Sequence, residues 1–353
     1  MLQALLSDAD QALGMLNAFA QLVPNIDFFI QMHITKEATK SSRIEGTQTN
    51  MEDVLIKQEE LNPEKRDDRE EVHNYINAIN FSIKRSKDLP IANKLIKETH
   101  NVLMQGVRGK HKNPGEYRNS QNWIGATLRD ATYIPPHHDE IVDLMSDLEK
   151  FLHAEDIFTP HLIRIAMLHY QFETIHPFLD GNGRMGRLLI TLYLVDKALM
   201  IKPALYLSDF FEQHRTYYYD NIQRVRTHND MTQWLKFFLV GVIETAKSSI
   251  ETFKNILALK ERIEREVLPK FGTRQKKVLD IINGLYNVPI ITVNELVKSS
   301  NLNYAAANRI IADLVNENIL KDMQLGTRNR LYIFEEYYKL FLNKIKYENN
   351  EKQ

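Results

Sequence analysis

The sequence predicts a mainly α-helical protein with one short β-hairpin and a small α+β domain at its C-terminus. Apolar residues recur with helical spacing up to about residue 265. β-Branched and aromatic residues gather around Gly125 and Asp130, just before Pro135 and Pro136, which is typical of a short hairpin. After Pro269 the pattern changes to short helical and strand-like segments, which indicates a separate small domain.

The order of these segments predicts the domain organisation. A chain of 353 residues with 43% hydrophobic residues can bury a sizeable core and divide into two or three domains. We expect the following parts: an N-terminal helical region (1–92), a helical core (93–247), a connecting helix (248–270), a small α+β domain (271–342) and a polar tail (343–353).

Composition and charge exclude several classes of protein. A formal net charge of −1 argues against a general nucleic-acid-binding surface. Without cysteine the chain can form neither a disulfide nor a thiolate metal site. The first residues lack the basic segment of a secretory signal, and no apolar run approaches the ~18 residues that a membrane helix needs. We therefore expect a soluble cytoplasmic protein without a membrane partner.

The most informative segment is His176–Arg187, which reads His-Pro-Phe-Leu-Asp-Gly-Asn-Gly-Arg-Met-Gly-Arg. Glycine and asparagine tolerate positive φ, so residues 181–183 can form a nest of backbone N–H groups that binds anions. The following residues have helical periodicity, so the nest opens onto a helix N-terminus, which also favours phosphate. Arg184 and Arg187 project from the first turn on one side.

His176 and Asp180 indicate chemistry in addition to phosphate binding. A carboxylate beside a phosphate site is repulsive unless a cation such as Mg²⁺ lies between them, so Asp180 implies a metal. His176 has an ordinary pKa of about 6.5 and is suited to remove a hydroxyl proton at neutral pH. Together these residues predict phosphoryl or nucleotidyl transfer to a hydroxyl group.

Other known motifs fit this segment less well. Residues 181–186 match the G-x-G-x-x-G pattern of dinucleotide folds, but residues 162–175 before them read as a helix and not as a strand. An EF-hand would require oxygen ligands where Phe178 and Leu189 stand. The Gly-Lys-Ser/Thr of a Walker loop is absent. An ordinary glycine-rich turn would leave the charged residues unexplained.

The segment resembles the signature of the Fic family, His-x-Phe-x-Asp/Glu-Gly-Asn-Gly-Arg-x-x-Arg, at every position, and the likeness extends from about residue 30 to residue 245. The resemblance implies a Fic-type helical bundle that transfers AMP from ATP, with Mg²⁺, to a hydroxyl of a target protein. It implies His176 as the base, Phe178 as a buried anchor and Asp180 on the metal. The residues that it assigns to ATP in this segment are Gly181, Asn182, Gly183, Arg184, Met185, Gly186 and Arg187.

An upstream segment, Ser41–Gly46, is similar to the inhibitory motif of the family, Ser/Thr-x-x-x-Glu-Gly/Asn. The resemblance implies an inhibitory helix at about residues 35–47. If this helix packs over the site, the Glu45 carboxylate can pair with Arg187 and remove it from the ATP γ-phosphate. Taken alone, Glu45 would read as a solvated helix residue beside a C-cap glycine.

The predicted hairpin lies where Fic proteins carry a flap that holds the target by adding it as an extra strand. We expect Ile124, Gly125, Ala126 and Thr127 near the nucleotide. The residues expected beside the protein substrate are Leu128, Arg129, Asp130, Ala131, Thr132 and Tyr133. The alternative is an ordinary surface hairpin. The adjacent His137 and His138 are assigned no role.

Tyr218 and Tyr219 resemble paired tyrosines of the family that line the adenine pocket. Such a pocket needs a flat apolar surface, which a tyrosine ring supplies. Aromatic residues at helical spacing are also common in cores, so a packing role stays open for both. Arg226, further along the same predicted helix, is a weaker candidate.

The C-terminal pattern resembles a winged helix: a helix at 276–285, a helix–turn–helix and two strands about a Gly-Thr-Arg-Asn turn. Its second helix would present Asn303, Tyr304, Asn308 and Arg309, and its wing Arg328 and Arg330. Winged helices bind DNA in some proteins and dock or dimerise proteins in others. DNA binding and a homodimer are therefore both open.

The sequence thus predicts a protein adenylyltransferase that is autoinhibited by Glu45. One alternative is a transcriptional regulator, in which the helical core senses nucleotide and the winged helix acts on DNA. The other is the reverse reaction, a hydrolase that removes AMP from a modified protein. The sequence does not identify the target protein, and it leaves ATP against other nucleotides open.

Overall fold

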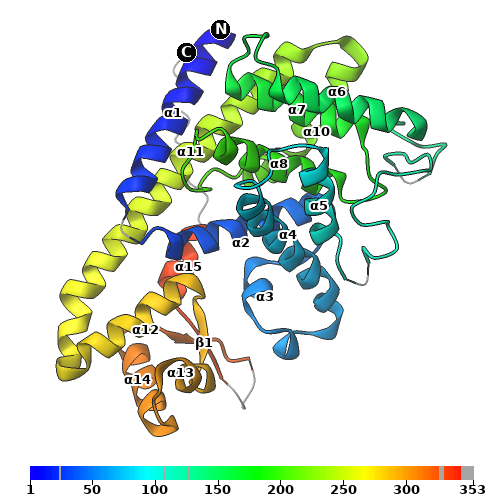
Figure 1. Cartoon of the computed structure of the whole chain (residues 1–353). Coiled ribbons are helices and arrows are strands. Elements are labelled where there is room, and N and C mark those ends of the chain that lie inside the picture. Colours follow the sequence, from blue (N-terminus) through cyan, green and yellow to red (C-terminus); the bar gives the residue numbers. More distant parts are fainter. Residues whose placement is uncertain (24, 107, 126, 326–329, 343–353) are drawn as a thin grey trace. The chain divides into compact units, whose positions relative to one another are not determined.

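The computed structural model describes residues 1–23, 25–106, 108–125, 127–325 and 330–342 (Figure 1). Ala126, Arg328 and the tail 343–353 lie outside these described residues. Helices make up most of the described chain, and three short strands form one sheet, so the predicted mainly α fold is confirmed. The chain divides into two compact units, residues 1–21 with 34–247, and residues 22–33 with 248–353.

The first unit consists of helices joined by loops and short 3₁₀ turns. Its helices are α1 (Leu2–Leu22), α2 (Asp27–Ile44), α3 (Met51–Leu55), α4 (Arg66–Arg85), α5 (Asn93–Leu103), α6 (Ile141–His153), α7 (His161–Ile175), α8 (Asn182–Asp196), α9 (Ser208–Gln213), α10 (Arg215–His228) and α11 (Met231–Arg262). Helices α1, α2 and α11 each extend beyond this unit.

Helix α8 lies at the centre of the first unit. It packs against α4, α5 and α7, and α7 in turn packs against α6 (Figure 1). Residues 184–194 of α8 are all buried. A helix that is apolar on every side is stable only inside a protein, and the run Leu188–Leu194 has this character. The predicted phosphate-binding segment therefore begins on the most deeply packed helix of the unit.

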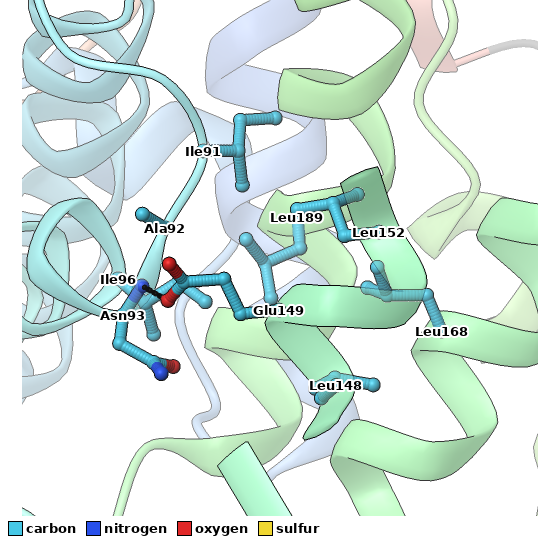
Figure 2. A pocket seen from close by; sticks show the side chains of 9 residues that line it. All are labelled: Ile91, Ala92, Asn93, Ile96, Leu148, Glu149, Leu152, Leu168 and Leu189. Atoms are coloured by element: carbon cyan, nitrogen blue, oxygen red, sulfur yellow. Dashed lines mark hydrogen bonds between the residues drawn. The ribbon is translucent and has the colours of Figure 1, made fainter. Parts of the chain in front are cut away.

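A small apolar pocket between α5, α6, α7 and α8 is a gap in this packing (Figure 2). Its volume is about 10 Å³, enough for one water molecule and far too small for a nucleotide. Glu149 at its edge accepts a hydrogen bond of 2.7 Å from the backbone N–H of Asn93 at the start of α5. This contact satisfies one of the N–H groups that a helix N-terminus leaves free.

The predicted hairpin is reduced to a loop closed by one antiparallel bridge between Ile124 and Tyr133. The N–H of Ile124 donates to the Tyr133 carbonyl at 2.9 Å, and the N–H of Thr132 donates to the Ile124 carbonyl at 2.8 Å. Gly125 has a φ of +139° and lies against the backbone of Asp130 and Ala131, where a Cβ would not fit. An isolated pair of strands is marginal in water, which agrees with this short ladder.

The second unit combines helices with the sheet. Its elements are α12 (Gln275–Asn287), β1 (Ile290–Thr292), α13 (Val293–Ser300), α14 (Tyr304–Asn316), β2 (Lys321–Asp322), β3 (Leu331–Ile333) and α15 (Glu335–Leu342). The strands are antiparallel in the order β1-β3-β2. Thr292 and Glu295 form a capping box at the start of α13, and Asn303 caps α14.

The element order matches the pattern from which a winged helix was predicted, and that role stays a prediction. Tyr304, Asn308 and Arg309 are exposed on α14, and the Asn303 side chain is used as the helix cap. Arg330 lies 3.4 Å from Asp322 as an exposed ion pair. Among the described residues, no helix is long and apolar enough to cross a membrane.

Candidate active site

His176 is the first residue after α7, and its backbone is in the left-handed region with φ 52°. Its N–H still donates to the Phe172 carbonyl at 2.9 Å, so the helix ends here and the chain turns toward α8. Non-glycine residues rarely adopt this conformation, and they do so where surrounding contacts enforce it. Arg118 provides such a contact, since its Nε donates to the His176 carbonyl at 3.0 Å.

Arg118 holds the loop and the base of the flap together. Besides His176, its guanidinium donates to the carbonyls of Ser120 at 3.2 Å and Pro136 at 2.5 Å. Its backbone N–H donates to the Pro177 carbonyl at 2.9 Å. The side chain is buried and its contacts are backbone carbonyls, so this arginine serves as a fixed connector.

The loop after His176 is closed by Asn182 and Phe178. The Asn182 side chain accepts from the Phe178 N–H at 2.9 Å and donates to the Phe178 carbonyl at 2.8 Å. The Phe178 ring is fully buried and stacks on the His100 imidazole, with 3.6 Å between the ring centroids. Phe178 is thus the buried anchor that the sequence predicted, and Asn182 uses its side chain to shape the loop.

His100 on α5 fixes the position of Asp180. Its Nδ1 accepts from the Gly115 N–H at 2.9 Å, so its Nε2 carries the proton and donates to the Asp180 carbonyl at 3.0 Å. Burial lowers the pKa of His100 to about 4, although the Asp180 carbonyl opposes this shift. A neutral imidazole, protonated on Nε2, therefore holds the loop at Asp180.

Gly181 and the first turn of α8 lie where an anion site is predicted, and of residues 181–183 only Gly181 has a positive φ. Gly181 has a φ of +76° and precedes the helix, and residues 182 and 183 already belong to it. The N–H groups of a first helical turn have no partner within the helix and are free to bind an anion. The Asp180 carboxylate accepts from the Gly181 N–H at 2.6 Å and is about half exposed, at 49%.

His176 is electrically neutral at physiological pH. Burial lowers the pKa of its imidazole to about 4; the Glu173 carbonyl and the charge of Glu45 oppose this shift, while Arg226 and Arg118 add to it. A neutral imidazole can accept a proton, as a general base must. The site therefore holds a proton acceptor beside a helix N-terminus that attracts anions.

Glu45 and Arg187 form an ion pair, with 2.5 Å between Oε1 and Nη2. Glu45 directly follows α2, whose end is set by Gly46 with a φ of +108°. Ser41 contributes two further contacts to Arg187, from its Oγ to Nε at 2.9 Å and from its carbonyl to Nη2 at 3.0 Å. The structure thus brings together the two segments that the sequence paired.

The charge of Glu45 is stabilised by its surroundings. Burial alone would raise the pKa of its carboxyl, but the charge and hydrogen bond of Arg187, with Arg184 and His176, lower the pKa below its ordinary value. Gly183 makes room for this pair, since a Cβ at Gly183 would overlap the Glu45 carboxylate. Glu45 therefore stays ionised at neutral pH and occupies space directly above the first turn of α8.

Helix α2 is anchored by Glu37, which is buried. Its carboxylate accepts from the Ser208 hydroxyl at 2.5 Å, the Ser208 N–H at 3.1 Å and the Tyr75 hydroxyl at 3.0 Å. Lys36 and Lys40 add ion pairs to Asp209. Residues of α4 and α9 thus hold the part of α2 that precedes Glu45.

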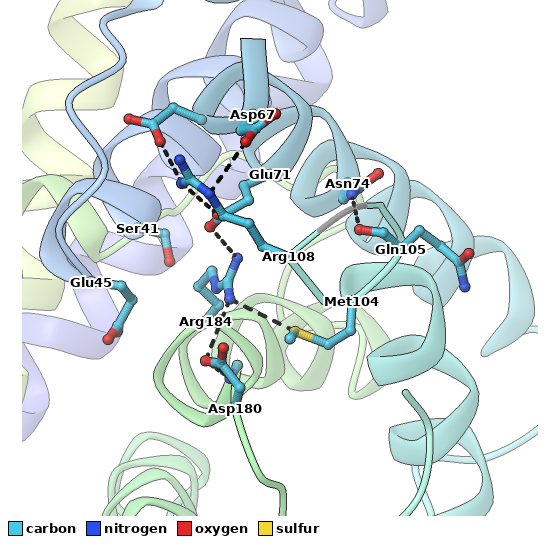
Figure 3. A network of polar contacts seen from close by, with 12 residues as sticks. Ser41, Glu45, Asp67, Glu71, Asn74, Met104, Gln105, Arg108, Asp180 and Arg184 are labelled. Carbon is cyan, nitrogen blue, oxygen red and sulfur yellow. Dashed lines mark hydrogen bonds and ion pairs between the residues drawn. The ribbon is translucent and has the colours of Figure 1, made fainter. Parts of the chain in front are cut away.

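Arg184 is paired with a different carboxylate (Figure 3). Its Nη1 lies 3.1 Å from the Glu71 carboxylate of α4. Its Nη2 lies 3.7 Å from the Met104 sulfur and 3.8 Å from the Asp180 carboxylate. The side chain is nearly buried, at 6% exposure. Both arginines of the predicted phosphate site are therefore held by acidic residues from the N-terminal part of the chain.

The flap is attached to the end of α7 through Tyr133. Its hydroxyl donates to the Thr174 carbonyl at 2.9 Å, and the Arg226 guanidinium lies 3.5 Å from the centre of its ring. Arg226 also donates to the Glu173 carbonyl at 3.0 Å. The side chain of Tyr133 is thus turned to α7. The exposed side chains of the expected protein-binding part are those of Leu128, Arg129, Asp130 and Thr132.

Tyr218 and Tyr219 have different environments. Tyr218 is buried, stacks on Phe211 and hydrogen-bonds His169 at 2.9 Å, so it packs in the core in this structure. Tyr219 is 41% exposed; burial, with the charge of Glu45, raises its pKa to about 12, while the charge of Arg187 opposes this shift. Tyr219 is therefore the better placed of the two to face a nucleotide.

Sequence reasoning missed three residues that shape the site: His100, Arg118 and Glu71. Each acts through a partner far along the chain; His100 and Asp180, for example, are 80 positions apart. A histidine on an amphipathic helix or an arginine in a loop carries no local pattern that reveals such a partner. Burial marks His100 and Arg118 once the fold is known, and the contact with Arg184 marks Glu71.

Comparison with known families agrees with this geometry. The sequence matches the Fic/DOC family over residues 90–194 and the Fic/DOC family N-terminal region over residues 3–84, together more than half of the chain. An α-helical bundle with the His176–Arg187 loop at the start of a central helix defines this class of protein. The chain belongs to the Fic/DOC family.

Among curated proteins, the chain is similar to proteins named protein adenylyltransferase Fic. It is 37% identical to the one from Culex quinquefasciatus over 124 residues and 36% identical to the one from Drosophila melanogaster over 121 residues. These matches cover 35% and 33% of the chain but only 22% of each relative. The chain thus matches less than a quarter of the length of these relatives.

Solved structures show the same fold. A Fic family protein from Desulfovibrio desulfuricans G20 has a TM-score of 0.58 at 21% identity, with 94% of this chain and 95% of that chain covered. Fic-1 from C. elegans has a TM-score of 0.52 at 19% identity, with 73% of each chain covered. At these identities the likeness shows the fold and does not extend to function.

Proposed function

We propose that the chain is a protein adenylyltransferase that transfers AMP from Mg-ATP to a Ser, Thr or Tyr hydroxyl of a target protein and is restrained by Glu45. The observation that carries the proposal is the placement of a neutral, buried imidazole beside the free N-terminus of α8. The names of the similar curated proteins support the same reaction.

In this mechanism, the His176 imidazole takes the proton from the target hydroxyl. The hydroxyl oxygen forms a bond to the α-phosphorus of ATP, and the bond from that phosphorus to the bridging oxygen breaks. Pyrophosphate leaves with the electron pair. The N–H groups of residues 182–184 and the guanidinium of Arg184 stabilise the negative charge on the phosphates, a contribution expected to dominate such transfers.

The residues present fit a magnesium ion. Asp180 offers an exposed carboxylate whose orientation is fixed by the Gly181 N–H and by the His100 contact to its backbone. Mg²⁺ is commonly bound by one or two carboxylates together with substrate phosphates and water, so one aspartate suffices. A bound ion would neutralise part of the charge on the phosphates.

The flap would position the target through its backbone. One bridge, between Ile124 and Tyr133, closes the flap among its described residues, which leaves backbone groups of these residues to pair with an added strand. Arg118 and Tyr133 fix the base of the flap to the loop that carries His176. A main-chain contact at this edge would place a target hydroxyl beside the imidazole with little dependence on the target sequence.

Glu45 restrains the reaction by occupying Arg187. An arginine whose Nε and Nη2 are already bonded to Ser41 and Glu45 cannot bind the γ-phosphate in the same way. The Glu45 carboxylate also adds negative charge where the phosphate would lie. ATP would then bind weakly or in an unproductive position.

Mass spectrometry of labelled proteins tests the proposed reaction. The purified parent chain, Glu45→Gly and Glu45→Gly with His176→Ala are incubated with ATP and Mg²⁺, alone and with a cell lysate. We expect AMP on the chain itself or on lysate proteins with Glu45→Gly, and none with the double variant. ATP analogues with other bases, used in parallel, establish which nucleotide is preferred.

Two outcomes would replace this proposal. If no variant labels any protein while the parent chain shifts a DNA fragment at moderate salt, a nucleotide-sensing regulator becomes the better account. If the parent chain instead removes AMP from a modified protein and Glu45→Gly does not, hydrolysis is the principal reaction.

A further inference from the structure

The two arginines of the phosphate site are held in opposite ways. The guanidinium of arginine presents Nε and Nη2 on one edge, and this edge binds a phosphate or carboxylate with two parallel hydrogen bonds. On Arg187 both nitrogens of this edge are occupied, Nε by Ser41 and Nη2 by Ser41 and Glu45. Arg187 is therefore closed to a phosphate in this structure.

On Arg184 the same edge is left open. Glu71 contacts Nη1, the nitrogen outside this edge, at 3.1 Å. Nε is buried and finds no hydrogen-bond partner among the described residues. The contacts of Nη2 are long, 3.7 Å to the Met104 sulfur and 3.8 Å to Asp180. A buried N–H without a partner is costly, so its retention suggests a ligand that satisfies it.

Glu71 is itself rigidly placed (Figure 3). Its other carboxylate oxygen accepts from Arg108 at 3.0 Å, and Arg108 is held in turn by Asp68 at 2.6 Å. Asp68 also accepts from the backbone N–H of Gln48 at 2.8 Å. Asp68 and Glu71 are both on α4, so this helix supplies the carboxylate that contacts Arg184 and one that holds Arg108.

From this contrast we infer that Glu71 is a positioning residue: it holds Arg184 by Nη1 so that the Nε and Nη2 edge is ready for the outer phosphates of a nucleotide. The inference rests on the proposed function, because it assumes that the site binds a nucleotide triphosphate. Glu71 thus differs from Glu45, although both are carboxylates paired with arginines of one motif. Glu45 occupies the edge of Arg187 that would bind a phosphate, whereas Glu71 leaves the same edge of Arg184 open.

Binding measurements on the full-length Glu45→Gly chain test this inference. Calorimetry with Mg²⁺ compares three probes: ATP, AMP and inorganic triphosphate. We expect Glu71→Ala to weaken ATP and triphosphate binding by about 10-fold, the usual effect of a lost charge-assisted contact, and AMP binding by less than about twofold. Glu71→Gln keeps an acceptor for Nη1 and should show a smaller loss.

Two controls separate positioning from general damage. Arg108→Ala leaves the direct contact between Glu71 and Arg184 and removes one support of Glu71, so it should weaken triphosphate binding less than Glu71→Ala does. In an Arg184→Ala background, Glu71→Ala should have no further effect on triphosphate binding, because its action passes through Arg184. The thermal midpoint of each variant shows whether the fold is intact.

Several results would overturn the inference. Tighter triphosphate binding by Glu71→Ala would show that Glu71 weakens nucleotide binding, as is proposed for Glu45. Equal losses for AMP and triphosphate, with a lowered thermal midpoint, would make it a structural residue. Unchanged triphosphate binding by Glu71→Ala would show that Glu71 has no role in binding the outer phosphates. If the Glu71 effect appears as expected but Glu45→Gly transfers no AMP, the proposed transfer reaction is wrong while the positioning role stands.

Discussion

His176 depends on residues that hold its unusual backbone conformation. A left-handed residue at the end of a helix is retained where neighbours enforce it, and here Arg118 bonds the His176 carbonyl while linking it to Pro136 at the base of the flap. At the residue scale, the backbone of His176 is therefore held by a side chain that itself contacts backbone carbonyls.

Arg118→Lys tests this dependence. Lysine keeps the charge but cannot contact three carbonyls from one planar group, so His176 and the flap should both be held less firmly. We expect AMP transfer by Glu45→Gly to fall by on the order of 10- to 100-fold, with nucleotide binding largely retained. Transfer rates and ATP affinity are measured on the same preparations; an unchanged rate would contradict the role of Arg118.

The pKa of His176 predicts the pH dependence of the reaction. Since burial lowers this pKa to about 4, the imidazole of the free enzyme stays neutral and able to accept a proton well below pH 6.5. Removing Glu45, which raises this pKa, should shift it further down. We expect kcat/KM of Glu45→Gly to decline only below about pH 5. A decline centred near about pH 6.5 would show an imidazole with an ordinary pKa.

Acid stability must be followed in the same experiment. A histidine whose pKa is lowered by folding binds protons more readily in the unfolded chain. Its contribution to stability is complete above the unfolded pKa of about 6.5 and is lost as the pH falls toward about 4. Circular dichroism across the pH series separates loss of fold from protonation of the base.

Glu173 should make the chain less stable at alkaline pH. Its carboxyl is buried, and burial raises its pKa to about 7, although Arg187 opposes this. Because folding raises this pKa, the contribution of Glu173 to stability is complete below the pKa of the unfolded chain. This contribution is lost as the pH rises through about 7. Glu173→Gln should remove this dependence and gain about 1–3 kcal/mol at alkaline pH. Urea unfolding at several pH values measures the free energy of unfolding. A parallel decline in the parent chain and in Glu173→Gln would contradict this role of Glu173.

At the element scale, α2 acts as a fixed support for Glu45. Glu37 binds Tyr75 of α4 and Ser208 of α9, so the helix is anchored about two turns before Glu45. Gly46 ends the helix directly after Glu45. We therefore expect Arg187 to be released through the turn at residues 45–47 and not through movement of the whole helix.

Glu37→Ala should loosen α2 without altering any group that contacts ATP. The Tyr75 and Ser208 donors would lose their shared acceptor, which costs about 1–3 kcal/mol for each buried polar group left unsatisfied. We expect a lower thermal midpoint together with AMP transfer above that of the parent chain and below that of Glu45→Gly. A lower midpoint without increased transfer would show that the anchoring of α2 does not control Glu45.

The elements were more predictable from sequence than the contacts. The loop and first turn of α8 could be predicted because glycine tolerates the left-handed backbone that Gly181 adopts, with a φ of +76°. The predicted hairpin has only a single bridge among its described residues, because residues with strand propensity form a ladder only if a partner strand supports them. The contact of Glu71 with Arg184 spans 113 positions and depends on the packing of α4 against α8, which no local pattern encodes.

At the scale of the whole molecule, the second unit includes residues 22–33 from near the N-terminus. Phe29 is buried there, with its ring edge-on to Tyr286 at 5.3 Å between centroids, and Tyr337 lies nearby at 6.4 Å. The chain therefore passes between the two units at three points, after residues 21, 33 and 247. A cut at residue 247 would expose the apolar side chains of residues 22–33.

Phe29→Ala tests this organisation. Loss of a buried aromatic ring costs about 3–5 kcal/mol, and the cost should fall on the second unit. We expect faster proteolysis within residues 248–342 and unchanged resistance of residues 34–247. Mass spectrometry of the fragments measures the rate of proteolysis in each region. Equal increases in the two regions would show that they unfold as one.

The central claim is that Arg187 binds either Glu45 or the γ-phosphate of a nucleotide. The rate of AMP incorporation by the full-length parent chain and by Glu45→Gly, measured side by side with Mg-ATP, tests it most directly. A charge-assisted contact of this kind predicts a rate on the order of 10- to 100-fold higher for Glu45→Gly, lost again with Arg187→Ala. Equal rates for the parent chain and Glu45→Gly would contradict the claim.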